Sequence, residues 1–328
     1  MTNLIFKNEI KLSEQTSEVD KRFDERRISL LPLIKNHLLN FELFKDQDVA
    51  VTFINGKGVS SIISLLETGG RRFILKIPLS IKYSLGEAQF LKVWASAGVN
   101  VPNIIDDGML GEHPYIIYDY IEADTLIDSY SRAELVENRI FVEIGQTMRM
   151  MHVPKATGYG HVIDGKAEYL NFEDWLESPE LMKKIGYVVE NKIITEEHGS
   201  IIVAKERLKK FIGKENVSSY CHEDITISNI FNTEPLTVFD PNPRFNHGYI
   251  DLARAIQGTI FDGDSDEART QLLEGYFGAD SYDIHALHAT VVFYCYMKLP
   301  YAHKNNKTKN IKNIQEYLLR TRDLLVMS

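Results

Sequence analysis

The sequence contains few cysteines and no long apolar run. Of its 328 residues only two are cysteine, Cys221 and Cys295. Two thiols so far apart do not make the disulfide framework of a small secreted protein, so a reduced, cytoplasmic setting is the simpler prediction. No stretch reaches the roughly 18 apolar residues that a membrane-spanning helix needs. The N-terminal segment MTNLIFKNEIKLSEQ resembles neither a secretory signal nor an Arg-rich transit peptide. We therefore expect no membrane partner.

An excess of positive charge is also missing. Lys and Arg number 37, Asp and Glu number 46, and the net charge is −9. Affinity for nucleic acid comes largely from cations that contact phosphates, so nucleic acid is a poor candidate partner. Hydrophobic residues make up 44% and charged residues 25%, which excludes a disordered chain. At about 150 residues per domain, this length predicts two domains or one large one.

The first part of the chain has the pattern of a small sheet. Short β-branched or aromatic runs, separated by turn residues, predict strands at 48–55, 60–67, 71–78, 103–108 and 113–121. A helical pattern at 83–97 lies between the third and fourth strands. We predict a nucleotide-binding lobe over residues 48–121, with a five-stranded antiparallel sheet and one helix, preceded by a helical extension over residues 1–47.

The character of the sequence becomes helical after residue 121. Apolar residues at helical spacing predict helices at 134–152, 172–185, 195–212, 248–260, 266–277, 283–299 and 308–326. A short β-rich segment interrupts them at 217–240. The predicted fold class is therefore α+β, with a mainly helical second lobe over residues 122–328.

The β-rich segment carries a group of polar residues suited to phosphoryl transfer. Asp224 follows a predicted strand in a polar loop, Asn229 comes five residues later, and Asp240 ends an apolar run. Carboxylate and amide oxygens suit Mg²⁺. A carboxylate that is not on the metal can orient a hydroxyl group and accept its proton. Metal ligands and such a base are what phosphoryl transfer requires.

Other parts of a kinase-type site precede this segment. Such sites place a lysine on a strand and hold its ammonium with a helix glutamate. Lys76 lies in the third predicted strand, and Glu87 lies in the following helix. The stretch NGKGVSS at 55–61 provides a glycine-bearing hairpin that can approach phosphates. It lacks the G-x-x-x-x-G-K-[ST] spacing, which excludes a P-loop nucleotide site.

Together these motifs resemble those of the aminoglycoside phosphotransferase/choline kinase superfamily, the small-molecule relatives of protein kinases. HEDITISN resembles the family's H-x-D-x-x-x-x-N catalytic loop, and VFDPN resembles its metal-binding segment. YIDLARAI resembles the segment whose aspartate, here Asp251, braces the catalytic loop. The resemblance covers about residues 45–300 and implies a protein-kinase-like bilobal fold.

The resemblance also implies roles for individual residues. It makes Asp224 the catalytic base, with His222 organising the loop. The implied binding residues are Asn229 and Asp240 for Mg²⁺, the Lys76–Glu87 ion pair for the nucleotide phosphates, Gly56, Gly58, Ser60 and Ser61 for the same phosphates, and the backbone of Tyr118, Asp119 and Tyr120 for the purine. The implied reaction moves the γ-phosphoryl group of Mg-ATP or Mg-GTP to a hydroxyl group of a small molecule.

The chain departs from protein kinases at one place and from the usual pattern of the small-molecule kinase family at another. Asp251 follows Asp240 after only 11 residues, which leaves no room for a protein-kinase activation segment and argues against a peptide substrate. Glu223 follows His222 where the family usually has glycine, so it either alters the loop backbone or adds a charge to the cleft.

The acceptor remains open between an antibiotic, a sugar, an amino alcohol and homoserine. We expect the helices after residue 125, including Trp175, to form its pocket. The acidic segment 261–267 suggests a cationic acceptor, although a solvated helix start explains the same residues.

Two other functions compete with the kinase. One is a catalytically silent pseudokinase that binds nucleotide as a regulator, which the loss of Lys76, Asp224 or Asp240 would favour; all three are present. The other is a metal hydrolase that uses His222, Asp224 and Asp240. It lacks the histidine-rich ligand set of such enzymes and leaves Lys76 and Glu87 unexplained.

Overall fold

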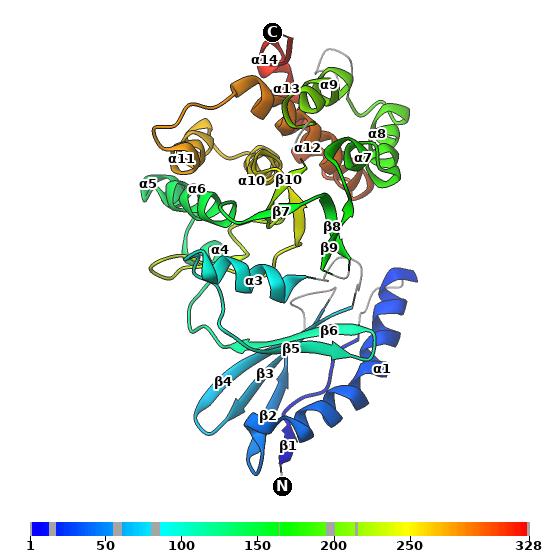
Figure 1. The fold of residues 1–328 in the computed structure, drawn as a ribbon, viewed down its shortest axis with the longest axis vertical. Coiled ribbons are helices and arrows are strands. Elements are labelled where there is room, and N and C mark those ends of the chain that lie inside the picture. The colour runs from blue at the N-terminus through cyan, green and yellow to red at the C-terminus, as the bar shows by residue number, and fades with distance from the viewer. Residues whose placement is uncertain are drawn as a thin grey trace. The chain divides into compact units, whose positions relative to one another are not determined.

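The chain folds into two units in a computed structural model. The structure describes residues 2–12, 18–54, 61–79, 86–163, 165–194, 201–213 and 216–326. Unit 1 comprises Met1–Lys92 and Val101–Glu122, and unit 2 comprises Val93–Asn100 and Ala123–Ser328. Figure 1 shows the sheet of unit 1 from blue to cyan and the helices of unit 2 mostly from green to red. No helix among the described residues is long and apolar enough to cross a membrane.

Unit 1 contains a six-stranded sheet in the order β1-β2-β3-β4-β6-β5. Its strands are β1 (Asn3–Phe6), β2 (Asp48–Phe53), β3 (Ser61–Thr68), β4 (Arg71–Pro78), β5 (Ile104–Leu110) and β6 (His113–Asp119). Burial alternates along β2 and β3, as expected for strands with one covered face. The inner strand β4 is buried from Phe73 to Pro78.

The N-terminal part of unit 1 differs from the prediction. The sheet has a sixth strand, β1, which pairs in parallel with β2 from Asn3↔Asp48 to Phe6↔Val51. The sheet is therefore not wholly antiparallel, and residues 1–47 are not only helical. Helix α1 (Glu18–Asn40) buries Leu30, Ile34 and Leu38 in the core of unit 1. A four-residue edge strand has too little pattern to be found in a sequence, because its partner decides its conformation.

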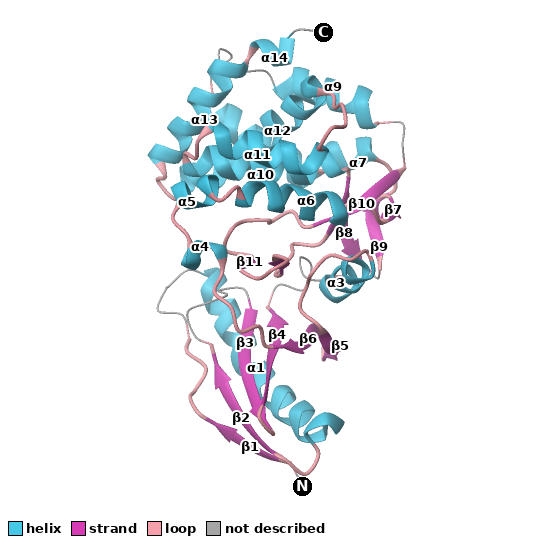
Figure 2. Ribbon diagram, turned by 90° about the vertical axis from the view of Figure 1, so that its left-hand side faces the viewer, coloured by secondary structure: helices cyan, strands magenta, loops and turns pink. Residues whose placement is uncertain are grey.

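Unit 2 is mainly helical. It contains α4 (Leu126–Ser129), α5 (Arg132–Glu137), α6 (Ile140–Met151), α7 (Phe172–Leu176), α8 (Pro179–Glu190), α9 (Ile201–Ile212), α10 (Gly248–Asp262), α11 (Asp266–Phe277), α12 (Ile284–Lys304), α13 (Thr308–Thr321) and α14 (Asp323–Val326). Figure 2 shows these helices gathered around α10. Burial extends along most of α10 and α12, which marks them as core helices. The helix predicted over 134–152 is divided, because Arg139 between α5 and α6 takes φ 56°.

Two small sheets interrupt the helices of unit 2. The first has the order β7-β10-β13-β8-β9, and the second pairs β11 with β12. Their strands are β7 (Lys155–Thr157), β8 (Tyr159–Ile163), β9 (Lys166–Tyr169), β10 (Val217–Cys221), β11 (Ile230–Phe231), β12 (Thr237–Val238) and β13 (Arg244–Asn246). The β-rich segment predicted at 217–240 is present, whereas β7, β8, β9 and β13 were not predicted. These strands have three to five residues, too few for a clear alternation.

The helix α3 (Glu87–Ser96) lies in the sequence where the two units divide. Its first turns belong to unit 1 and carry Glu87. Its last turn belongs to unit 2 and carries Trp94, which is fully buried. Both residues take part in the geometry described next.

Candidate active site

A buried carboxylate holds the loop of residues 222–229 against α10. Asp251 lies in the first turn of α10 and is completely buried. Its Oδ2 accepts hydrogen bonds from the backbone N–H of His222 at 2.7 Å, and its Oδ1 accepts one from the backbone N–H of Glu223 at 2.7 Å. His152 at the end of α6 places its Nε2 3.0 Å from the same Oδ2. The loop therefore leaves β10 in a direction set by one side chain.

The electrostatics of this brace favour a charged aspartate. Burial by itself raises the pKa of Asp251, but the hydrogen bond from His152 and the neighbouring histidines outweigh it, so the pKa lies below its usual value. The other ring nitrogen of His152 lies 2.8 Å from the hydroxyl of Tyr276. A side chain at Gly248 would collide with that hydroxyl group, so the helix start requires glycine for space.

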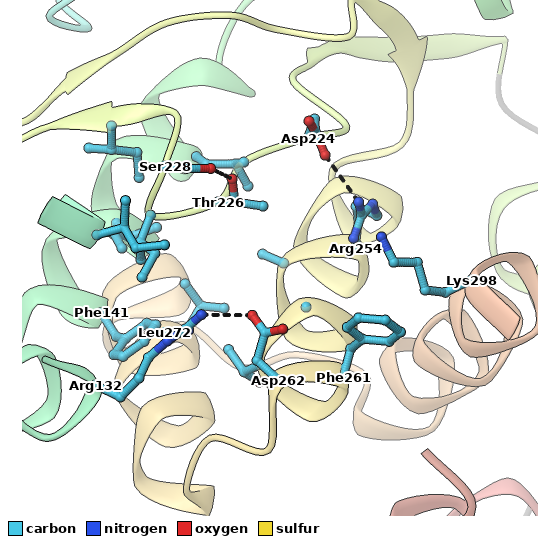
Figure 3. A pocket seen from close by; sticks show the side chains of 18 of the residues that line it. Arg132, Phe141, Asp224, Thr226, Ser228, Arg254, Phe261, Asp262, Leu272 and Lys298 are labelled. Carbon is cyan, nitrogen blue, oxygen red and sulfur yellow. Dashed lines mark hydrogen bonds and ion pairs between the residues drawn. The ribbon is translucent and has the colours of Figure 1, made fainter. Parts of the chain in front are cut away.

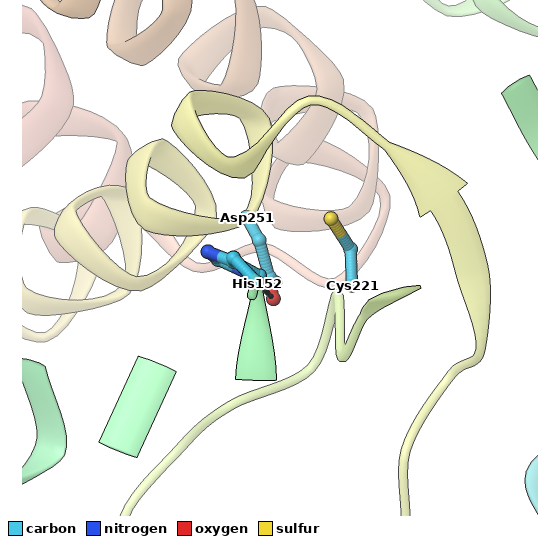
Figure 4. Close-up of side chains that lie close together, drawn as sticks. All are labelled: His152, Cys221 and Asp251. Carbon is cyan, nitrogen blue, oxygen red and sulfur yellow. Dashed lines mark hydrogen bonds and ion pairs between the residues drawn. The ribbon is translucent and has the colours of Figure 1, made fainter. Parts of the chain in front are cut away.

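His152, Cys221 and Asp251 lie close enough together to resemble a metal centre (Figure 4). Burial raises the pKa of the Cys221 thiol well above its usual value, so the sulfur keeps its proton. That thiol donates to the carbonyl oxygen of Asn246 at 3.4 Å. Because metals bind the thiolate, and because Asp251 already accepts hydrogen bonds from the loop, these groups act as a structural brace.

His222 connects the 222–229 loop to the residue that follows β12. Its ring stacks on Trp94, with centroids 5.8 Å apart and planes inclined by 4°. Its Nδ1 accepts the backbone N–H of Asp224 at 3.3 Å, so its Nε2 carries the proton and donates to the carbonyl oxygen of Phe239 at 3.0 Å. The loop and the end of β12 are thereby held together.

Asp224 is the partly exposed carboxylate of this loop. Its side chain is 46% exposed, and its Oδ1 accepts a hydrogen bond from Nη2 of Arg254 at 3.0 Å. Asn229 donates its amide nitrogen to the backbone oxygen of Asp224 at 2.8 Å and to its Oδ2 at 3.3 Å. The carboxylate is thus oriented by two neighbours but still accessible.

Arg254 was missed by the sequence analysis. It lies in YIDLARAI, three residues after Asp251, which places it about one helical turn further along α10. Its Nη1 donates to Oε1 of Gln257 at 2.9 Å. The spacing from Asp251 was a usable signal, but only the fold shows that the helix directs this guanidinium at Asp224.

Asn229 and Asp240 lie at the same end of a two-stranded ribbon. Asn229 directly precedes β11, and Asp240 follows β12 after one residue. The strands are antiparallel, and the N–H of Phe239 donates to the carbonyl oxygen of Asn229 at 3.1 Å. Both described side-chain hydrogen bonds of Asn229 use its nitrogen. Its amide oxygen and the Asp240 carboxylate therefore form a donor set that suits Mg²⁺.

Glu223 does not add a charge to an open site. Its side chain is buried, and its two oxygens accept hydrogen bonds from Asn246 and Tyr294, each at 2.9 Å. Arg244 lies 3.7 Å from the same carboxylate. The backbone φ of Glu223 is 51°, in the left-handed region that favours glycine. The second of the two predicted consequences, an added charge in the cleft, is therefore not observed, and Glu223 takes a backbone conformation that suits glycine.

Unit 1 contains a buried ion pair. Lys76 Nζ lies 2.7 and 2.8 Å from the two carboxylate oxygens of Glu87, and both side chains are at most 6% exposed. Lys76 lies on β4 between Ile63 of β3 and Ile116 of β6. Removing two charges from water costs free energy that hydrophobic residues would not cost, so the pair is poorly explained by stability alone.

The other predicted nucleotide contacts in unit 1 are placed only in part. Gly56, Gly58 and Ser60 lie outside the described residues, whereas Ser61 begins β3 opposite Pro78.

Tyr118 and Asp119 end β6, and Tyr120 follows them. The N–H groups of Asp119 and Tyr120 already donate to the carbonyl oxygens of Asn103 and Arg72 at 3.0 Å. A purine contact there would therefore use a carbonyl oxygen or the chain beyond Tyr120.

A pocket of about 330 Å³ opens beside Asp224 within unit 2 (Figure 3). The 222–229 loop forms one wall, and α10 and α12 form others. Trp175, expected in this pocket, lies instead in the core, where its ring packs against Phe172 and Phe293. The size is typical of a small-molecule site.

Comparison with known proteins identifies the family. The model of the phosphotransferase enzyme family, APH, matches residues 53–288. The chain belongs to this family. It is therefore a phosphotransferase of the kinase class, as predicted from the sequence. No curated protein matches the sequence at a significant level.

Several solved kinase structures share the fold at low sequence identity. Aminoglycoside phosphotransferase APH(4)-Ia is 15% identical, with a TM-score of 0.59 over 88% of this chain and 98% of that one. An ethanolamine kinase from Plasmodium vivax is 13% identical, with a TM-score of 0.58 over 97% of each chain. A choline/ethanolamine kinase family protein from Mesorhizobium loti is 14% identical, with a TM-score of 0.55 over 91% of this chain and 95% of that one. The predicted α+β, protein-kinase-like fold class is confirmed.

Proposed function

We propose that this phosphotransferase moves the γ-phosphoryl group of Mg-ATP to a hydroxyl group of a small molecule, with Asp224 as the catalytic base. The observation that carries the proposal is the position of Asp224, whose carboxylate is oriented by Arg254 and Asn229 and lines a pocket of about 330 Å³. APH(4)-Ia has been crystallised in ternary complexes with AMP-PNP or ADP and hygromycin B, which supports ATP as the co-substrate.

In the proposed step Asp224 accepts the proton of the acceptor hydroxyl. The hydroxyl oxygen forms a bond to the γ-phosphorus, and the bond between that phosphorus and the β–γ bridging oxygen breaks. ADP leaves with the bridging oxygen and its electron pair. Because Arg254 donates to Oδ1, the aspartate is held in one orientation for the incoming hydroxyl.

The remaining residues would bind the nucleotide. Lys76, positioned by Glu87, would contact the phosphates, along with the segment of Gly56, Gly58, Ser60 and Ser61. Asn229 and Asp240 would hold Mg²⁺, which neutralises charge on the transferred phosphoryl group. Backbone groups near Tyr118, Asp119 and Tyr120 would contact the purine, and the choice between ATP and GTP follows from that contact.

Thermal unfolding in the presence of nucleotide tests the first half of this proposal. A ligand at 100 times its Kd adds about 2.7 kcal/mol to the free energy of unfolding. For a chain of this length we expect the midpoint to rise by roughly 2–4 °C per kcal/mol. Mg-ATP should produce the rise, and ATP with EDTA should produce little of it.

Asp240→Asn provides the matched variant for the metal. It should remove most of the metal-dependent rise while leaving the midpoint of the ligand-free protein nearly unchanged, since the side chain is exposed. Equal Mg-ATP shifts in the variant and the parent chain would contradict the metal role. Binding of Mg-ATP without transfer to any hydroxylated acceptor would favour the pseudokinase.

A further inference from the structure

The pocket beside Asp224 has the opposite charge to the rest of the chain. The chain carries an excess of acidic residues, with a net charge of −9. The pocket is lined instead by four basic side chains, Arg132, Arg254, Lys298 and Lys307, against two acidic ones, Asp224 and Asp262. A lining drawn at random from this composition would contain more carboxylates than cations.

Both aspartates of the pocket are already paired. Asp224 lies 3.0 Å from Arg254, and Asp262 lies 2.8 Å from Arg132. Within the part of the chain that the structure describes, no ion pair closer than 4.0 Å joins Lys298 or Lys307 to a carboxylate. Asp224 and Asp262 attract Lys298 from a distance, but neither lysine is engaged in an ion pair with a described residue, so both ammonium groups can bind an anionic ligand.

The two lysines converge on the same pair of aromatic rings. Lys298 Nζ lies 5.0 Å from the ring centroid of Phe261 and 4.8 Å from that of Tyr301. Lys307 Nζ lies 5.8 and 5.0 Å from the same two centroids. Two ammonium groups gathered in this way repel each other, and the ring faces offset only part of that repulsion. An anion bound between them would turn the repulsion into attraction.

The surroundings of Lys298 point in the same direction. Burial and the charge of Arg254 lower the pKa of Lys298 to about 8, so its charged form is less stable than in water. Figure 3 shows its ammonium directed toward Arg254 and Asp224 rather than away from the pocket. A bound anion favours the charged form of a lysine.

The acidic segment 261–267 offers little to a cation. Asp262 and Asp264 each lie 2.8 Å from the guanidinium of Arg132. Asp266 pairs with Arg269 and with Arg320. The three aspartates of this segment are therefore engaged with arginines of unit 2, and Glu267 accepts a hydrogen bond from Gln271.

We propose that the acceptor of this enzyme carries an anionic group, a carboxylate or a phosphate ester, in addition to the hydroxyl that is phosphorylated. Lys298 and Lys307 bind the anionic group, while Asp224 faces the hydroxyl. Gly258 also lines the pocket and borders open space, since a side chain there would meet no atom within 4 Å. The inference rests on the proposed function and replaces the cationic acceptor suggested by residues 261–267.

Four three-carbon probes that carry an anionic, a neutral or a cationic group at one end test the inference. They are glycerol 3-phosphate, glycerate, glycerol and 3-aminopropane-1,2-diol. Each is added, at constant ionic strength, to the full chain saturated with Mg-AMP-PNP, so that no probe can occupy the position of the γ-phosphate. The Kd is measured by calorimetry, and the thermal midpoint is measured in parallel.

We expect one or both anions to bind and to raise the midpoint beyond the value with nucleotide alone. Glycerol and the amine should give no such rise. The relative size of the two anion signals separates a phosphate ester from a carboxylate. Binding of the amine, or of neither anion, would overturn the inference.

Lysine variants locate the anion. Lys298→Met and Lys307→Met should each weaken anion binding by roughly 10- to 100-fold, the range for a lost hydrogen bond to a charged group. Lys298→Arg keeps the charge and should keep most of the affinity. Lys304→Gln is the matched control, because Lys304 lies on the same helix but contacts Tyr187 away from the pocket. If the anion still binds with the parent affinity in both methionine variants, its site lies elsewhere and the proposal is refuted.

The two proposals fail separately. If Mg-AMP-PNP does not stabilise the parent chain, the proposed function fails at the nucleotide. If the nucleotide binds and transfer proceeds to glycerol or to the amine but to neither anion, the phosphotransferase stands and the anionic acceptor is wrong. Lys307 is partly exposed, so its variant keeps the test valid even if Lys298→Met does not fold.

Discussion

The geometry around Asp224 depends on a few individual side chains. Asp251 anchors the start of the 222–229 loop, His222 links the loop to β12, and Arg254 orients the Asp224 carboxylate. The contacts are short hydrogen bonds made by the Asp251 carboxylate, a ring nitrogen of His222 and the Arg254 guanidinium. Substitutions here should therefore affect activity more than overall stability, except where the group is completely buried.

Asp224→Asn tests the base at this scale. The amide is nearly the same size but cannot accept the hydroxyl proton, so kcat should fall by about 10²–10⁴. Mg-ATP should still stabilise the variant, which shows that the fold and the nucleotide site survive. The measurement is the rate of ADP formation with an acceptor that the parent enzyme phosphorylates. An unchanged kcat would show that Asp224 is not the base.

Glu223→Gly separates backbone strain from buried hydrogen bonds. The left-handed φ of 51° costs about 1–2 kcal/mol for a residue with a side chain, and glycine removes that cost. The same change takes away the acceptor of Asn246 and Tyr294, and each buried group left unpaired costs about 1–3 kcal/mol. We expect a net loss of stability in urea unfolding.

Glu223→Gln serves as the control for this experiment, because it keeps one carbonyl acceptor and the same backbone. It should lose less stability than Glu223→Gly. A glycine variant more stable than the parent chain would show that strain dominates at this position.

At the scale of elements, α6 and α11 pack so closely that glycine is required at their crossing. A Cβ on Gly145 would collide with the backbone oxygen of Leu272, and a Cβ on Gly275 would collide with the backbone oxygen of Val142. The contact between these helices positions His152 at the end of α6, where it meets Asp251. Helix packing and the candidate active site are thus connected through one residue.

Gly275→Ala should push α6 and α11 apart. Overpacking of this kind costs about 1–3 kcal/mol of stability, which denaturant unfolding will measure. Gly186→Ala in α8 is the matched control, since its new methyl would meet nothing closer than an ordinary contact of 3.9 Å with Glu190. That variant should be more stable by roughly 0.5–1 kcal/mol because alanine favours a helix. Equal effects of the two substitutions would contradict the close crossing.

At the scale of the whole molecule, buried histidines make stability depend on pH. His288 of α12 is 4% exposed, and burial, with the charges of His285 and Arg207, lowers its pKa from 6.5 to about 4. Between these values the unfolded chain binds the proton and the folded chain does not. The contribution of neutral His288 to the free energy of unfolding is therefore fully present above pH 6.5 and is lost as the pH is lowered toward 4.

Unfolding at pH 7.5 and at pH 5 measures this effect. The single His288 should cost about 2 kcal/mol at pH 5 relative to neutral pH. His288→Gln cannot titrate, so the difference between its two free energies of unfolding should be smaller by about that amount. The same pH difference in the parent chain and the variant would show that His288 is not the group responsible.

The sequence by itself determined the family, the fold class and the kinase activity, because each motif that carries them is a short segment of the chain. Asp224 and Asn229 are five positions apart, Lys76 and Glu87 lie on neighbouring elements, and local periodicity predicted most strands and helices. Their proposed roles rest on this order and spacing together with the resemblance to the family.

Only the tertiary structure decided which groups meet across long separations. β1 depends on pairing with β2 some forty residues later, and Arg254 reaches Asp224 only because α10 packs behind the loop. The basic lining of the pocket arises in the same way, since Lys298 of α12 and Lys307, which precedes α13, join Arg254 of α10 only in the folded chain. Composition predicted an acidic molecule, but the charge inside a pocket depends on which few side chains the fold directs into it.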